Sequence, residues 1–201
     1  RGEVIPSDQE LTLQGPGGKI AVENTLVELS GNGGGAAFIR AGQLVLDNAI
    51  IRSNTFGNQD GQDISLKVTE SAYLSGVNSE FSVSTVSYKN AGGIFVETPY
   101  LEMTNALIHT GATLAGAAGP IEIRANQVSL KDGAMIGSAV VGTGDTGDLT
   151  LNVTERLSLS GFYPGWRFSH GYPTVNGNSA ILTSSIGTGS VGNIWIYTKE
   201  L

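Results

Sequence analysis

A short pattern recurs along the chain and restricts the folds that it can adopt. In each copy a glycine is followed, after one or two residues, by two aliphatic residues with one residue between them. The copies are marked by the first aliphatic position of each: Ile20, Ala37, Ile64, Ile94, Ile121, Leu149 and Ile194. They are 17, 27, 30, 27, 28 and 45 residues apart. Such a period of 20 to 50 residues indicates a repeat architecture, and the long last interval indicates an insertion.

A longer period lies over the short one. Residues 40–46 match residues 124–130 at an offset of 84, and residues 64–70 match residues 149–155 at an offset of 85. Three short units therefore form one larger unit, and the two larger units span about 37–120 and 121–201.

Within one unit the apolar residues alternate with polar ones. Ile121, Ile123 and Ala125 follow this period of two, and after a short turn Val128 and Leu130 resume it. This alternation predicts short β-strands, because a helix would need apolar residues three and four positions apart.

The middle of each unit carries a polar corner residue. Asn48, Asn105 and Asp132 occupy equivalent positions between two apolar runs. Asn and Asp tolerate a left-handed backbone and form local hydrogen bonds, so they are typical of turns. Glycines precede the first strand of each unit, and we expect the chain to turn there as well.

Short strands repeated in this way could form hairpins, propeller blades or a solenoid. Hairpins would need two-residue turns between adjacent strands, and blades usually take about 40 to 45 residues each. A right-handed parallel β-helix of about seven coils fits best, with one unit forming one coil. We expect an irregular lead-in or partial coil over 1–17, a single β-helix over 18–201, and a loop insertion over about 162–178.

The composition excludes several classes of protein and partner. The net charge of −7 argues against a nucleic-acid partner, since phosphate binding needs clustered Lys and Arg. The chain has no Cys and two His, which argues against disulfides, thiolate metal sites and an ordinary zinc site. We predict no cofactor. We expect no membrane span, because no apolar run approaches about 20 residues. Charged residues make up 14% and hydrophobic residues 40%, which is enough to build a core.

Several segments resemble the repeats of filamentous-haemagglutinin-like exoproteins. They are residues 147–154 followed by 157–161, residues 128–136, and residues 184–194. Such proteins occur in cyanobacteria and other Gram-negative bacteria and leave the cell by two-partner secretion. The resemblance covers most of 18–201 and implies a β-helical shaft, an extracellular or outer-surface location and a role in adhesion. The family's export domain carries Asn-Pro-Asn motifs, and this sequence has no Asn-Pro pair, so we expect shaft rather than export domain.

The insertion contains the most unusual segment of the sequence. Five of the fourteen aromatic residues fall within 162–172. One hypothesis is a glycan site, where aromatic faces stack on sugar rings and polar groups bind hydroxyls. The other, which we favour, is a lid whose aromatic residues fold onto the outer face of the coils. The candidate ligand-binding residues are Tyr163, Trp166, Arg167, Phe168, His170 and Tyr172.

Two glycine-rich corners carry pairs of carboxylates three residues apart. They are formed by Asp60 with Asp63 and by Asp145 with Asp148, again 85 residues apart. Such pairs are weak candidates for Ca²⁺ binding. The nonapeptide calcium repeat does not occur here, so we interpret them as solvated turn residues and predict no metal site.

We expect a non-catalytic protein, because the acidic residues are scattered and no nucleophile motif occurs. The predicted function is a structural or adhesive shaft segment of a large secreted or cell-surface exoprotein. The alternatives are a glycan-binding module that uses 162–172 and an extracellular filament subunit that self-associates head to tail. The expected partners are flanking coils of a longer parent chain that continues past Leu201, and surface glycans or receptors of host or neighbouring cells.

Overall fold

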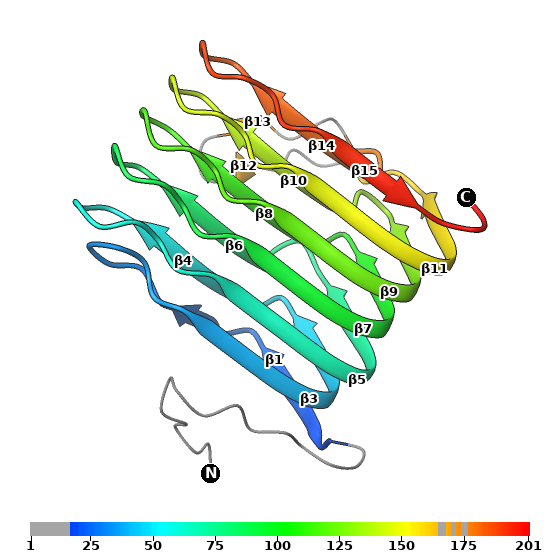
Figure 1. Ribbon diagram of the computed structural model, residues 1–201. Coiled ribbons are helices and arrows are strands. Elements are labelled where there is room, and N and C mark those ends of the chain that lie inside the picture. Colours follow the sequence, from blue (N-terminus) through cyan, green and yellow to red (C-terminus); the bar gives the residue numbers. More distant parts are fainter. Residues whose placement is uncertain (1–16, 165–167, 170–171, 174–176) are drawn as a thin grey trace.

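The computed structural model describes residues 17–164, 168–169, 172–173 and 177–201. In this part of the chain all regular structure is β-strand, and two parallel sheets stack as a β-solenoid (Figure 1). The predicted fold class is therefore confirmed. The larger sheet has seven strands in the order β1 (Lys19–Glu23), β3 (Ala37–Asp47), β5 (Ile64–Ser75), β7 (Ile94–Thr104), β9 (Ile121–Lys131), β11 (Leu149–Ser160) and β15 (Ile194–Tyr197). The smaller has six in the order β2 (Leu26–Glu28), β4 (Ile50–Thr55), β6 (Glu80–Thr85), β8 (Leu107–Ala112), β10 (Met135–Val140) and β14 (Ala180–Ser185).

Each coil consists of one long strand, a corner, one short strand and a loop that returns to the next coil. The inward aliphatic residues stack in register, as Ile94, Ile121 and Leu149 do, and all three are at most 1% exposed. Removing this surface from water is the main stabilising term of the fold. Five coils have full-length strands in both sheets, rather than about seven. The first coil has only the short strands β1 and β2, and in the last coil only β15 is formed.

The polar corner residues have the predicted left-handed backbone. The φ angles of Asn48, Asn105 and Asp132 are 47°, 54° and 51°. Two other coils have Gly76 and Gly161 at this corner, with φ of 97° and 78°. The backbone N–H groups of Asn48, Gly76, Asn105 and Asp132 each donate to a carbonyl at the end of the long strand in the following coil, for example from Asn105 to Lys131 at 3.0 Å.

The glycines before the long strands have a role beyond the turn that we expected there. Gly92, Gly119, Gly147 and Gly192 do not have positive φ angles. They stack in one column where the coils approach closely, and an added Cβ would lie 1.9 to 2.5 Å from a carbonyl oxygen of the preceding coil. The glycines are needed for close stacking of backbones rather than for a left-handed turn.

The long last interval is an insertion at the corner between β11 and β14. Its ends are joined by an antiparallel bridge between Phe162 and Asn178. Within the insertion, β12 (Phe168–Ser169) pairs with β13 (Tyr172–Pro173). Beyond the insertion, β14 rejoins the solenoid in register with β10. The predicted lead-in over 1–17 lies almost entirely outside the described residues.

Candidate functional site

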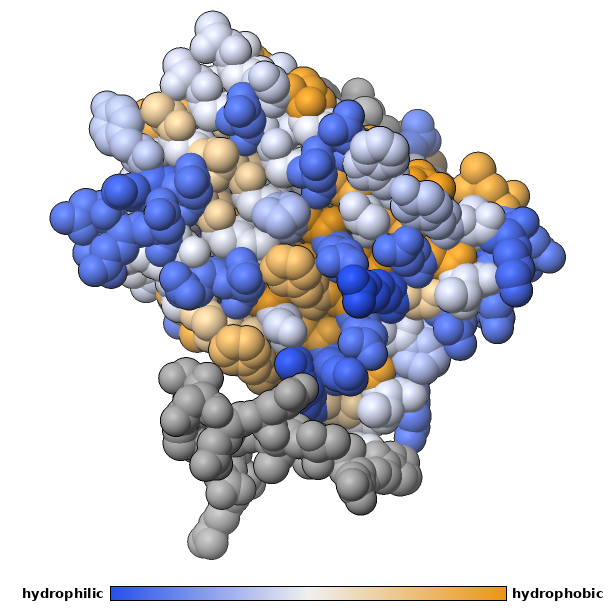
Figure 2. Space-filling view, viewed as in Figure 1, coloured by the Kyte–Doolittle hydropathy of each residue, from blue (hydrophilic) through white to orange (hydrophobic). Residues whose placement is uncertain are grey.

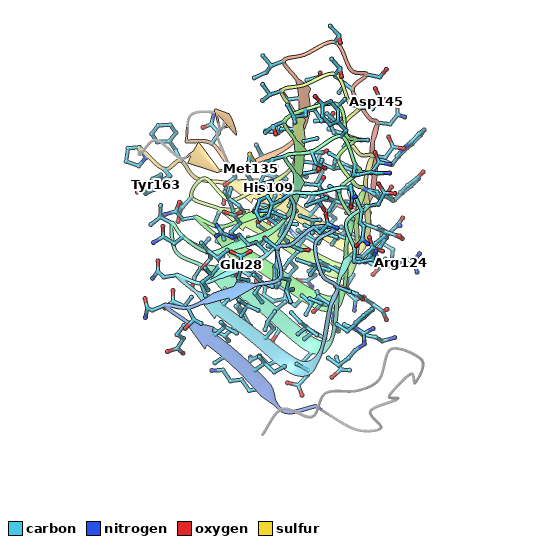
Figure 3. The ribbon with its side chains drawn as sticks, turned by 90° about the vertical axis from the view of Figure 1, so that its left-hand side faces the viewer. Glu28, His109, Arg124, Met135, Asp145 and Tyr163 are labelled. Carbon is cyan, nitrogen blue, oxygen red and sulfur yellow. The ribbon has the colours of Figure 1, made fainter. Side chains whose placement is uncertain are left out.

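The aromatic insertion is described only in part. Trp166, Arg167 and His170 lie outside the described residues, and only the backbone of Phe168 and Tyr172 is described. Tyr163 is half-buried at the base of the insertion and projects from the flank of the solenoid (Figure 3). The predicted glycan site at 162–172 therefore stays a prediction.

The four aspartates of the glycine-rich corners join consecutive coils. The Asp60 and Asp63 carboxylates accept backbone N–H groups of the next coil at 2.9 and 2.7 Å. Asp145 and Asp148 do the same at 2.6 and 2.7 Å. No group of three potential metal ligands occurs among the described residues. The spacing of 85 residues therefore reflects a repeated hydrogen bond between coils, made by exposed turn residues.

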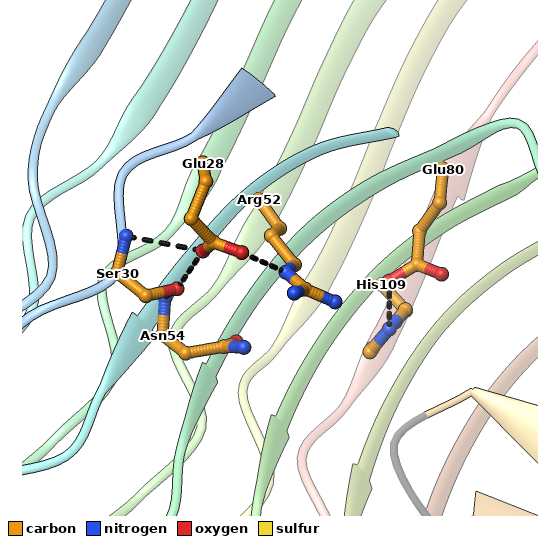
Figure 4. Close-up of polar contacts among 6 residues, drawn as sticks. All are labelled: Glu28, Ser30, Arg52, Asn54, Glu80 and His109. Carbon is orange, nitrogen blue, oxygen red and sulfur yellow. Dashed lines mark hydrogen bonds and ion pairs between the residues drawn. The ribbon is translucent and has the colours of Figure 1, made fainter. Parts of the chain in front are cut away.

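The outer face of the six-stranded sheet carries a first polar cluster around Glu28 (Figure 4). Arg52 Nε lies 2.6 Å from Glu28 Oε2, and the Ser30 amide donates to Glu28 Oε1 at 3.2 Å. Ser30 Oγ in turn accepts a hydrogen bond from the backbone N–H of Asn54 at 2.8 Å. Burial raises the pKa of Glu28, but the hydrogen bonds from Ser30 and Arg52 outweigh it, so this pKa lies below its usual value. The cluster joins the first coil, which carries Glu28 and Ser30, to the second, which carries Arg52 and Asn54.

A second cluster on the same face surrounds Ser82. His109 Nε2 lies 3.1 Å from Glu80 Oε1, and both side chains are nearly buried. Ser82 is in register with Arg52 on one side and His109 on the other. The Ser82 hydroxyl is fully buried and has no hydrogen-bond partner among the described residues. Because it is closed to solvent, this cluster does not form an open site.

The outer face of the seven-stranded sheet is the most accessible candidate surface. Six of the fourteen aromatic residues lie there, whereas Phe81 is the one aromatic residue in the described core. Aromatic side chains that remain exposed are typical of interaction surfaces. The space-filling view of this side shows apolar and polar side chains intermingled along the solenoid (Figure 2). The six residues are Phe38, Tyr73, Phe95, Tyr100, Trp195 and Tyr197.

Three of these aromatic residues share one straight line across the strands. This aromatic column has one residue per coil, as the registers of β3, β5, β7, β9, β11 and β15 establish. Phe38 is 69% exposed at one end of the line and Trp195 is 50% exposed at the other. Phe95 lies between them, with its ring over Gly93. The complete column is Phe38, Ser65, Phe95, Glu122, Thr150 and Trp195.

A polar column runs beside the aromatic column, two residues further along each strand. Its charges are largely paired: Lys67 Nζ lies 3.2 Å from Glu97, and Arg124 lies 2.6 Å from Glu122 in the aromatic column. These side chains stay at least partly exposed, so their donors and acceptors can reach a ligand. The complete polar column is Arg40, Lys67, Glu97, Arg124, Asn152 and Tyr197.

A tyrosine pair lies farther along the same face. The Tyr73 and Tyr100 ring centroids are 5.8 Å apart in an edge-to-face arrangement. Tyr100 donates to Glu102 Oε2 at 2.6 Å, and Lys131 Nζ donates to the same atom at 2.8 Å. The hydrogen bond to Glu102 raises the pKa of Tyr100 to about 12, and Lys131 and Tyr100 lower the pKa of Glu102. This network fixes the tyrosine pair on the sheet surface.

Our sequence reasoning missed this face, although a signal for it was present. Phe38, Phe95 and Trp195 each directly follow the first aliphatic residue of a unit. Because strand residues alternate between faces, that position points outward whenever the aliphatic residue points into the core.

Comparison with known proteins adds no relative. No protein-family model matches the chain, and no curated protein or solved structure matches it. Among the described residues no helix is long and apolar enough to cross a membrane.

Proposed function

We propose that this chain is a non-catalytic shaft segment of a large secreted or cell-surface exoprotein, in which it serves as a rigid spacer and adhesive stalk. The sequence resemblance to filamentous-haemagglutinin-like exoproteins points to this role, and the β-solenoid fold is consistent with it. Fold alone does not define function, so the proposal depends on features of this particular solenoid.

The observation that carries the proposal is the uncovered C-terminal coil. Ile194 and Ile196 are 39% and 41% exposed, whereas Leu149 and Leu151, their partners one coil earlier, are fully buried. We propose that a flanking coil binds this open edge, covers these core residues and pairs with β15. This interface would join the segment rigidly to the rest of the shaft.

The charges of the edge strands favour the same arrangement. Solenoids and sheets usually protect open edges with charged residues, because a bare edge pairs with other chains. β14 and β15 contain no charged residue, whereas β1 carries Lys19 and Glu23 and β2 carries Glu28. The C-terminal edge strands therefore lack the charged residues that usually protect a bare edge.

Head-to-tail stacking of identical copies is less well supported. β15 is in register with the first half of β11, from Leu149, whereas β1 is in register with the second half of β3, up to Asp47. The two end strands would therefore lie over different parts of the coil. A flanking coil of the parent chain fits the open end better than a second copy of this segment.

Surface location is tested by treating intact producing cells with a protease and detecting the segment with an antibody. Loss of the signal without cell lysis is expected, and a protected cytosolic pool as the main form would refute the proposal.

Rigidity is tested with spin labels on cysteines at positions 38 and 195, since the chain has no native cysteine. Five coil spacings separate them, about 24 Å at ~4.8 Å each, and we expect a narrow distance distribution.

A further inference from the structure

We infer that the aromatic column binds an extended, neutral polysaccharide of β-1,4-linked sugars, with the polymer lying along the solenoid axis. This inference rests on the proposed adhesive function and names its ligand. It concerns the outer face of the seven-stranded sheet, not the insertion at 162–172.

The first argument is the spacing of the rings. Phe38 and Phe95 are two coils apart and Phe95 and Trp195 are three coils apart, which corresponds to roughly 10 and 14 Å at a strand spacing of ~4.8 Å. One coil spacing is close to the length of one sugar unit in an extended β-1,4-linked chain. A polymer along the axis therefore places about one sugar over each coil, and every aromatic ring meets a sugar.

The second argument is the chemistry at each coil. A pyranose ring presents C–H groups on its faces and hydroxyls around its edge, so it stacks on an aromatic ring and hydrogen-bonds sideways. The aromatic column supplies rings in three coils, and the parallel polar column supplies one polar side chain in each coil from Arg40 to Tyr197. Both kinds of contact are thus available along the same line.

The third argument concerns charge and shape. Lys67 is paired with Glu97 and Arg124 with Glu122. Among the described residues, Arg40 is then the one cation of the polar column without a carboxylate partner, so the column has little free positive charge to attract an acidic polymer. A protein partner would favour a central cluster of aromatic residues in a pocket. Here the exposed rings are separated along a line by Ser65 and by the positions between Phe95 and Trp195, which suits a linear ligand.

The inference is tested by co-sedimentation of the purified chain with microcrystalline cellulose and with chitin, and starch granules serve as the α-linked control. We expect binding to at least one β-1,4-linked polymer and none to starch, and the two arms distinguish glucose from N-acetylglucosamine units. Phe95→Ala should weaken binding on the order of tenfold, since one central stacking contact is lost. Phe56→Ala is the matched control, because Phe56 is 56% exposed but lies on a loop outside the column.

Thermal unfolding followed by circular dichroism shows whether each variant is folded. If Phe95→Ala is not, Phe38→Ala and Trp195→Ala carry the test, since both side chains are at least half exposed and contribute little to packing. Failure of the chain to sediment with either β-1,4-linked polymer would overturn the inference, as would equal binding by the column variants and the control. These results are independent of the cell-surface assay, so a surface-located chain that binds neither polymer refutes the ligand alone.

Discussion

Replacing Gly147 with alanine tests the proposed reason for the glycine columns. The added Cβ would lie 1.9 Å from the Gly119 carbonyl oxygen, whereas ordinary van der Waals contact begins at 3.4 Å. The obstacle is backbone, which cannot rotate away, so the two coils must separate locally by about 1.5 Å.

The cost of this separation follows from the neighbouring hydrogen bonds. The backbone N–H of Ile121 donates to the backbone carbonyl of Asp148, and that of Ala118 to the backbone carbonyl of Asp145, both at 2.9 Å, and neither bond survives such a displacement. Each lost bond costs about 0.5–1.5 kcal/mol, and overpacking strain adds about 1–3 kcal/mol. Alanine also lowers the conformational entropy of the unfolded chain, which offsets about 0.4–1 kcal/mol of this loss. We therefore expect Gly147→Ala to lower the free energy of unfolding by about 3 kcal/mol.

Urea unfolding followed by circular dichroism measures this change, and two other glycines calibrate it. An added Cβ at Gly31 meets nothing within 4 Å, so Gly31→Ala should be neutral or slightly stabilising. An added Cβ at Gly192 would lie 2.5 Å from the Gly147 carbonyl oxygen, a milder clash than at Gly147, so Gly192→Ala should cost less than Gly147→Ala. Equal stabilities of the Gly147 and Gly31 variants would refute the close-stacking explanation.

Three further predictions concern corners, titration and coil contacts. Asn105→Ala should lose about 1–2 kcal/mol in urea unfolding because alanine is strained at φ 54°, and Asn105→Gly should stay near wild type; equal losses would contradict this. In an ultraviolet titration Tyr100 should ionise at about pH 12, and Glu102→Gln should lower that pKa. Because the folded pKa is raised, the stability contributed by Tyr100 is present below pH 10 and lost as the pH rises toward 12. Asp148→Ala should lower the free energy of unfolding by about 1 kcal/mol, because it removes the carboxylate that accepts the backbone N–H of Asn193. Asp148→Asn keeps an oxygen at that place and should lower it less.

The sequence was sufficient to predict the parallel solenoid and its polar corners. The period of 27 to 30 residues and the alternation at Ile121 and Ile123 can be recognised directly in the sequence. The corner at Asn105 could be predicted because Asn tolerates a left-handed backbone and lies between two apolar runs. The number of complete coils was harder to predict, because the first coil forms only the short strands β1 and β2 and the last coil only the four-residue strand β15. The close stacking of Gly147 also depends on contacts between coils, which no single unit displays.

The candidate surface was missed for a related physical reason. Phe38, Phe95 and Trp195 are 57 and 100 residues apart in the sequence, and only the register of the sheet brings them into one line. The aromatic residues at 162–172 are close in sequence and therefore attracted attention first. The role of Asp148 was missed because its partner, the Asn193 amide, lies beyond the insertion.

The insertion between β11 and β14 has an evolutionary consequence. The chain leaves the coil at Gly161 and returns by Ser179, yet β14 keeps the register of β10, and β11 keeps that of β9 apart from one bulge between Val153 and Arg156. A corner of this kind can lengthen without changing the coils on either side, and each doubling of loop length costs only about 0.6 kcal/mol of closure entropy. Segments or whole domains can therefore be inserted, exchanged or deleted at this corner while the strands of the solenoid keep their positions. Grafting a small folded domain there would equip the scaffold with a new activity at little thermodynamic cost.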